Sequence, residues 1–193
     1  MNKAERTRRF IIEKSASIIN RKGMAGTSLS DIMEATKLAK GGIYGNFENK
    51  EEICMEAFLY LTETLARRLD GAVNLGRNAK EKFHNLLEAY KGNKDVEGGC
   101  PILNFGVEAD DTHPNMKVYV KKAINSSQKR ILNIISDGIA NEEISSTVNP
   151  KNFSVKVFAM IEGAILCRRV VENDEQMRIV MDSIWEEFES FLK

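Results

Sequence analysis

The stretch from Thr27 to Lys50, which reads TSLSDIMEATKLAKGGIYGNFENK, decides the fold of this chain. It predicts two short helices that are joined by a tight turn and followed directly by a longer one. Ser28 is placed to cap the first short helix, with Asp31 three residues later as its capping-box partner. Asn49 is placed to cap the longer helix, which begins at Lys50.

The second short segment, Lys40–Phe47, is too small and too rich in glycine to be stable as a helix on its own. We expect Ile43 and Phe47 to hold it by packing against their neighbours. The remaining side of the segment then faces outward and carries Lys40, Gly41, Gly42, Tyr44 and Asn46. Small residues allow a close approach, while Lys, Tyr and Asn supply hydrogen bonds, so this side suits the major groove of DNA.

Several residue types recur at fixed spacing in this region: Gly23-Met24, Thr27-Ser28, Lys40-Gly41-Gly42-Ile43-Tyr44-Gly45-Asn46-Phe47 and Asn49-Lys50-Glu51. With them, residues 5–55 closely resemble the N-terminal DNA-binding domain of the TetR family of bacterial transcriptional regulators. The resemblance implies an all-α fold, in which a three-helix domain with a helix-turn-helix precedes a larger helical domain for effector binding and dimerisation. It also implies a ligand-responsive regulator, most often a repressor, that binds a palindromic operator as a homodimer.

Three positions depart from the family pattern and concern the choice of operator. Lys37 stands where a turn glycine is usual, and a left-handed conformation there would cost about 1 kcal/mol. Ala39 replaces the usual serine cap of the recognition helix, and Ser30 stands where the family often has arginine.

The predicted DNA contacts differ in role. Lys40, Gly42 and Asn46 are expected nearest the base edges, while Tyr44 and Lys50 are expected at phosphates, Lys50 as a clamp at a helix N-terminus. The complete predicted set is Thr27, Ser28, Ser30, Lys40, Gly41, Gly42, Tyr44, Asn46 and Lys50. Arg6, Arg8 and Arg9 in the first helix are placed either to touch DNA or to lie as solvated surface charge.

The charge of the chain is distributed unevenly. Its 193 residues carry no net charge, yet residues 1–50 carry +5 and residues 51–193 carry −5. A positive segment is what an approach to nucleic acid requires. We therefore predict a DNA-binding domain at 1–50 and an effector-binding and dimerisation domain at 51–193.

No run of residues reaches the roughly 18 to 20 apolar positions that a membrane span requires. We therefore expect a cytoplasmic protein. Three cysteines without a CxxC pair favour neither a disulfide framework nor structural zinc, and we expect no cofactor and no metal. Glu108, Asp110, Asp111 and His113 suggest a metal site, but a helix break followed by a cap explains the same residues.

The rest of the chain reads as helices, about nine in total. Caps and breakers predict a first helix at 3–22, ended by Gly23, and a long helix at 50–76. The next helix is capped by Asn78 and broken at Lys91-Gly92-Asn93-Lys94, and a polar loop follows at 95–99. Four more helices are expected to begin at Cys100-Pro101, near Pro114, at Asn149-Pro150 and at Asp174.

The last two helices are apolar over more than one side, which favours pairing with a second copy as a four-helix bundle. The alternative is that they only close the core of the monomer. The predicted interface is Phe158, Ile161, Ala164, Ile165, Met181, Ile184, Trp185 and Phe188.

The resemblance implies an effector pocket among the middle helices, and the aromatic and Met content there suggests a small apolar or aromatic ligand. The residues we assign to it are Phe58, Leu61, Phe83, Leu87, Tyr90, Cys100, Phe105, Met116 and Tyr119.

Cys100 supports a second hypothesis. It follows Gly98-Gly99, which we expect to leave the thiol accessible, and it stands at an expected helix N-terminus, where the helix dipole favours a thiolate. The segment GGCPILNF is similar to one in TetR-like repressors that sense electrophiles or oxidants. A further alternative is a helical small-molecule binding protein or enzyme with a vestigial DNA-binding domain. The sequence contains no hydrolase, metalloprotease or phosphate-loop motif, so we name no catalytic residue for it.

Overall fold

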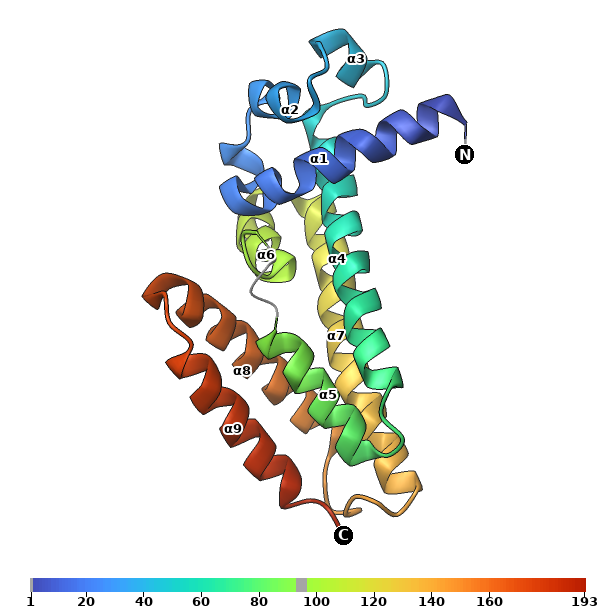
Figure 1. Cartoon of the computed structure of the whole chain (residues 1–193), viewed down its shortest axis with the longest axis vertical. Helices are drawn as coiled ribbons and strands as arrows, with labels where there is room; N and C mark the ends of the chain where they lie inside the picture. The colour runs from blue at the N-terminus through green and yellow to red at the C-terminus, as the bar shows by residue number, and fades with distance from the viewer. Residues whose placement is uncertain (1, 93–96) are drawn as a thin grey trace. The chain divides into compact units, whose positions relative to one another are not determined.

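The computed structural model describes residues 2–92 and 97–193, and over these residues the chain is all-α (Figure 1). The described helices are α1 (Lys3–Gly26), α2 (Leu29–Thr36), α3 (Lys40–Tyr44), α4 (Lys50–Asn74), α5 (Ala79–Lys91), α6 (Pro101–Thr112), α7 (Pro114–Ala140), α8 (Pro150–Val171) and α9 (Glu175–Glu189). A single isolated antiparallel bridge joins Ile144 to Leu192 in the described chain. The predicted fold class, all-α with about nine helices, is confirmed over these ranges.

The predicted caps set the helix starts. The Ser28 hydroxyl accepts the Asp31 N–H at 3.1 Å, and the Asp31 carboxylate accepts the Ser28 N–H at 2.8 Å, which completes the capping box. The Asn49 side chain accepts the Glu52 N–H at 2.8 Å. Because each cap binds an N–H group that lacks a partner within its helix, these polar residues fix where the helices begin.

The expected helix ends are less accurate than the starts. α1 does not stop at Gly23: that glycine breaks it with φ at 81° and ψ at 166°, and the chain resumes helical turns to Gly26. α4 ends at Asn74 rather than near Gly76. α5 ends at Lys91, as expected, but the rest of the predicted break (Asn93, Lys94) and the first part of the predicted loop (95–96) lie outside the described residues.

The chain divides into two compact units. The first contains Met1–Thr64 and Val96–Lys121, and the second contains Leu65–Asp95 and Lys122–Lys193. α6 therefore belongs with the helices that we assign to DNA binding. The predicted boundary at residue 50 separates the helix-turn-helix domain from the rest of the chain. The two compact units are divided differently, because the first also contains the start of α4 and all of α6.

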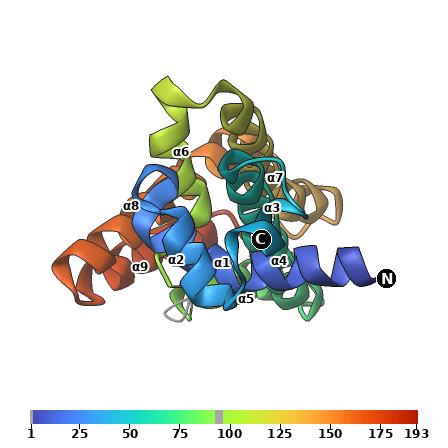
Figure 2. The ribbon, with the colours of Figure 1, turned by 90° about the horizontal axis from the view of Figure 1, so that it is seen from above.

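The first unit is built around α1. In Figure 1, α2 and α3 lie on one side of α1 and α6 lies on the other. Figure 2 shows α2 beside the C-terminal part of α1, in agreement with the contacts between them. The side chains buried in this unit include Ile11, Ile12, Ile19, Ile32, Ile43, Phe47 and Ile53.

The second unit has an aromatic core. The ring of Phe83 on α5 stacks on that of Phe188 on α9 with centroids 4.3 Å apart, and it also contacts Phe153 on α8 at 5.7 Å. α8 and α9 run side by side (Figure 1) and contact each other. Such ring pairs add to the free energy gained by burial, so α8 and α9 are part of the monomer's own core.

Candidate nucleic-acid interface

α3 presents two different sides. Ile43 and Phe47 are 0% and 2% exposed, so the expected packing of the segment is confirmed. Lys40, Gly41 and Tyr44 face solvent, and a Cβ placed on Gly41 would meet no atom within 4 Å. Nothing in the described first unit therefore obstructs an approach to this side of α3.

Two contacts within the segment restrain side chains on this open side. The Lys40 Nζ lies 5.8 Å from the centroid of the Tyr44 ring. The Asn46 side-chain Nδ2 donates to the Gly42 carbonyl at 2.8 Å. The Asn46 amide has a second N–H that this bond does not use, and this N–H can donate to a base edge.

The turn before α3 carries the expected irregularities. Lys37 adopts a left-handed conformation with φ at 58°, which costs a non-glycine residue about 1 kcal/mol or more. Ala39 precedes α3 without a side-chain capping bond. A five-residue helix without a cap has little stability of its own, so tertiary contacts must hold it.

Arg8 provides such a contact. Its guanidinium donates to the backbone carbonyl of Asn46 and to the carboxylates of Glu52, at 2.7 Å, and Glu56. It also lies over the Phe47 ring, 4.2 Å from the centroid. The hydrogen bond to Glu52 raises the pKa of Arg8, and the same bond lowers the pKa of Glu52. Arg8 therefore ties the end of α3 to α1 and α4.

The other two arginines differ from Arg8. Arg9 pairs with Glu13 one turn along α1 at 2.7 Å, and both side chains are exposed. Arg6 is exposed. Exposure without DNA fits both alternatives of the sequence prediction for Arg6 and Arg9, which stay open, whereas Arg8 has the structural role described above.

Lys50 does not lie as the free phosphate clamp that the sequence predicts. Its Nζ donates to the carbonyls of Met24 at 2.8 Å and Thr27 at 2.9 Å. An ammonium group has three N–H donors, so one remains for a phosphate. The side chain crosses from the start of α4 to the turn between α1 and α2, and sequence alone gives no sign of this because both acceptors are backbone atoms.

Replacing Lys50 with methionine distinguishes a role in holding the turn between α1 and α2 from a role in binding a DNA phosphate. Methionine keeps the unbranched apolar stem but removes both hydrogen bonds, so we expect the melting temperature to fall by about 3–8 °C. Because we assign Lys50 to these bonds rather than to a phosphate contact, we expect the salt dependence of DNA binding to stay as in the wild type. Lys40→Met is the matched control and should do the reverse, reducing the slope of log K against log salt by about one per site while stability is kept. An unchanged melting temperature with a reduced slope in Lys50→Met would contradict the role that we assign to this residue.

The residues at the start of α2 also differ in exposure. Thr27 is 0% exposed, and its hydroxyl donates to the Gly23 carbonyl at 2.7 Å, so its side chain supports the turn rather than facing DNA. Ser28 is exposed but acts in the capping box, and Ser30 is exposed on α2. In the described structure, Ser28 and Ser30 share solvent exposure with Lys40, Gly41, Gly42 and Tyr44.

Comparison with known proteins agrees with this geometry. A family model described as "Bacterial regulatory proteins, tetR family" matches residues 11–57, and one described as "Tetracyclin repressor-like, C-terminal domain" matches residues 79–184. The crystal structure of a TetR-family transcriptional regulator from Cytophaga hutchinsonii is 37% identical, covers 100% of this chain and 98% of its own, and superimposes with a TM-score of 0.94.

The chain belongs to the TetR family. A TetR regulator from Chloroflexus aurantiacus is also similar, at 30% identity and a TM-score of 0.94 over 100% of this chain and 98% of that one. Among curated proteins, the HTH-type transcriptional regulator TtgR of Pseudomonas putida is 26% identical over 171 residues, which cover 84% of this chain and 80% of that protein. As a TetR-family member, this chain is a DNA-binding transcriptional regulator and not an enzyme.

The dimer interface predicted for this TetR-family chain needs correction. Seven of its eight side chains are at most 7% exposed within the single chain, where they form the core between α8, α9 and their neighbours. These residues are Phe158, Ile161, Ala164, Ile165, Met181, Ile184 and Phe188. Trp185 is partly exposed, with its ring 5.4 Å from His84 and 5.6 Å from Phe188. Side chains already packed inside the monomer are not available to a second copy.

A different stripe of α8 is open to solvent. It consists of Val155, Ala159, Gly163, Leu166 and Val170, which recur every three or four residues and so share one side of the helix. Leu166 is 47% and Val170 is 73% exposed, and a Cβ on Gly163 would meet no atom within 4 Å. α8 is therefore apolar on two sides: the larger side chains chosen from the sequence lie in the core of the chain, and this stripe faces solvent.

The residues predicted for the effector pocket are mostly buried and belong to both units. Phe58 and Phe105 contact each other in the first unit with ring centroids 5.1 Å apart, and Phe83 takes part in the aromatic core of the second. Leu87 and Tyr90 lie with Phe83 in the second unit, and Leu61, Cys100, Met116 and Tyr119 lie in the first. Their role in ligand binding stays a prediction.

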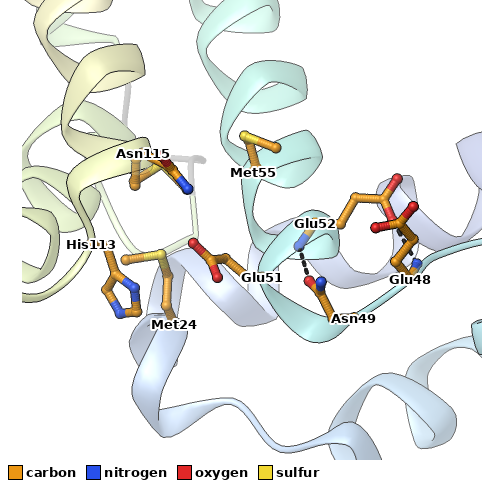
Figure 3. Close-up of a pocket in the computed structure, with 9 residues that line it drawn as sticks. Met24, Glu48, Asn49, Glu51, Glu52, Met55, His113 and Asn115 are labelled. Atoms are coloured by element: carbon orange, nitrogen blue, oxygen red, sulfur yellow. Dashed lines mark hydrogen bonds between the residues drawn. The ribbon is translucent and has the colours of Figure 1, made fainter.

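An open hollow of about 330 Å³ lies in the first unit, beside the start of α4 (Figure 3). It is lined by Met24, Glu48, Asn49, Glu51, Glu52, Met55, His113, Asn115 and Met116. Figure 3 shows the Glu51 carboxylate directed toward the side where Met24 and His113 lie. Three glutamates make this hollow a poor match for the apolar effector that we predict, and Met116 alone of the predicted pocket residues lines it.

Cys100 lies at the predicted place, directly before α6 with Pro101 at the first helical position. However, Cys100 is only 2% exposed and Gly99 is buried, which corrects the expectation that the two glycines leave the thiol accessible. A buried thiol is protected from electrophiles, so the structure gives no support to the sensing hypothesis.

Two of the four residues that suggested a metal site, Glu108 and Asp110, are engaged in other interactions. Within the described residues, no group of three or more His, Cys, Asp or Glu side chains is placed to hold a metal ion. Asp110 pairs with Lys117 at 2.7 Å, and Glu108 accepts hydrogen bonds from backbone N–H groups of α1.

As for membranes, none of the helices described here has the length and apolar character needed to cross one.

Proposed function

We propose that this TetR-family chain is a ligand-responsive repressor that binds a palindromic operator as a homodimer. The observation that carries the proposal is the open side of α3, where Lys40, Gly41, Gly42 and Tyr44 face solvent above a buried Ile43. A recognition helix with small and basic residues on its outer side fits the major groove. Because operator DNA lies in the bacterial cytoplasm, we place the protein there.

The apolar stripe on α8 supports the proposed homodimer. Exposed apolar residues at helical spacing favour a partner that covers them, and a two-fold axis lets the same stripe serve both subunits. On α9, the helix that packs against α8, Ile179 is a further exposed apolar side chain, at 54%. Two-fold symmetry would place two α3 helices about 34–36 Å apart, or a multiple of this, on successive major grooves.

Release from DNA is proposed to occur by a population shift. A small apolar or aromatic effector would favour a spacing of the two α3 helices that no longer fits successive grooves. α4 is suited to transmit this change because it begins beside the helix-turn-helix at Lys50 and contributes residues to both compact units. Lys40, Tyr44 and Asn46 then carry the operator contact that the effector abolishes.

Selection from random duplex DNA tests the proposal. The wild-type protein should enrich a palindrome and bind it at nanomolar concentration, with an affinity that falls steeply as salt rises. The bound complex should contain two chains per palindrome by light scattering. Failure to enrich any sequence, together with weak binding to every duplex, would overturn the proposed function.

Asn46→Ala is expected to change the preference among operators. Loss of its amide should reduce discrimination at one base pair of each half-site by about 1–3 kcal/mol and leave binding to random-sequence duplex unchanged. The measurement is competition between the selected palindrome and its single-base variants. A uniform loss of affinity for all duplexes would instead assign Asn46 a backbone contact.

A further inference from the structure

Two side chains of opposite charge hold the Met24–Thr27 turn, which leads from α1 into α2. From α6, the Glu108 carboxylate accepts the Met24 N–H at 2.5 Å and the Ala25 N–H at 3.3 Å. From α4, the Lys50 ammonium donates to the carbonyls of Met24 and Thr27. Hydrogen bonds to charged groups are among the stronger ones in proteins, so Glu108 and Lys50 together fix the backbone of this turn.

Gly23 makes the approach of Glu108 possible. Its φ of 81° is a conformation that side-chain-bearing residues rarely adopt, and a Cβ there would clash with the Glu108 carboxylate. The break at Gly23 also exposes the N–H groups of the residues that follow it. The carboxylate thus binds the first two N–H groups after the break.

A second polar contact lies one turn earlier on the same side of α6. The Asn104 Nδ2 donates to the Asn20 carbonyl at 3.0 Å and to the Gly98 carbonyl at 2.6 Å. Asn20, which is 2% exposed, in turn donates to the carbonyl of Gly99 at 3.0 Å. Positions 104 and 108 are four apart and face the same way on a helix, so they form one seam between α6 and α1.

We propose that Glu108 is a positioning residue for operator binding: through the Met24–Thr27 turn it makes α6 and the helix-turn-helix one mechanical body, so that the placement of α6 sets the placement of α3. This inference rests on the proposed function. The grouping of α6 with α1, α2 and α3 in a single compact unit supports it independently of the hydrogen bonds. The neighbours of Glu108, Val107 and Asp111, are exposed and have no part in the seam.

The test compares Glu108→Ala and Glu108→Gln with Asp111→Ala, which removes an exposed carboxylate from the same helix. Two quantities are measured for each variant: hydrogen exchange at the Met24 and Ala25 amides, and the ratio of affinities for the selected palindrome and for a random-sequence duplex of equal length. The ratio is informative because non-specific binding depends on charge, whereas the palindrome requires both α3 helices to be in place.

We expect Glu108→Ala to speed exchange at both amides by at least about tenfold and to lower the affinity ratio by about tenfold. Glu108→Gln, which keeps one acceptor oxygen at the same reach, should recover part of both effects, and Asp111→Ala should change neither. Amides that exchange as in the wild type, or an affinity ratio within about twofold of that of Asp111→Ala, would overturn the proposal. If the wild type enriches no palindrome, the proposed function fails, while the exchange measurement still decides whether Glu108 holds the turn.

Discussion

Glutamate in place of Gly41 is expected to abolish operator binding without lowering the thermal stability of the chain. Gly41 lies on the open side of α3, and the space beside it is empty. The new carboxylate would lie against phosphates and base edges in both subunits, so we expect the affinity for the selected palindrome to fall by at least about 100-fold. Because glutamate favours helices more than glycine does, by about 0.5–1 kcal/mol, the melting temperature should stay the same or rise.

Gly71→Glu is the matched control for this change. Gly71 is also an exposed helical glycine where an added Cβ would meet no atom within 4 Å, but it lies on α4 in the second compact unit. The two variants have the same charge and the same change in helix propensity. Equal losses of operator affinity in both would show that net charge alone, and not the location on α3, causes the effect.

Leu166→Glu is expected to convert the proposed dimer to monomers and to weaken operator binding with it. Leu166 lies in the α8 stripe and is 47% exposed in the single chain, so the substitution leaves the monomer core intact. Burying two like charges across a two-fold axis costs about 3 kcal/mol or more, which corresponds to an increase of at least about 100-fold in the dimer dissociation constant. Light scattering across a concentration series measures the change directly.

Two further variants separate assembly from folding. Leu75→Glu alters another exposed leucine, 80% accessible and outside the stripe, and should leave the dimer unchanged. Phe158→Ala should instead destabilise the folded monomer by about 3–5 kcal/mol, because this ring belongs to the core. A Leu166→Glu protein that remains a dimer at low micromolar concentration would show that the stripe is not the interface.

Sequence was a good guide wherever a local rule decides the structure. The Ser28 and Asn49 caps, the buried side of α3 and the left-handed Lys37 depend on residues close together in the chain, and the structure confirms each of them. The family resemblance covered the same region, because its motif is defined by turns and caps. The outward residues of α3 therefore followed from the pattern without knowledge of the rest of the fold.

Sequence was a poor guide where long-range packing chooses between alternatives. α8 carries apolar residues on two sides, and its pattern does not say which side meets α9 and which meets solvent. The bonds of Lys50 and Glu108 go to backbone atoms that any residue supplies, so they leave no trace in residue types. Cys100 is buried by packing that its glycine neighbours do not reveal.

The distribution of the three thiols has a practical consequence. Burial raises the pKa of the Cys54 thiol to about 11, and Cys100 is almost fully enclosed. Cys167 on α8 is the exposed member of the three, directly after Leu166. The natural chain thus carries a single attachment point for a maleimide dye, next to the surface where we place the second subunit, and its fluorescence can follow assembly without any change of sequence.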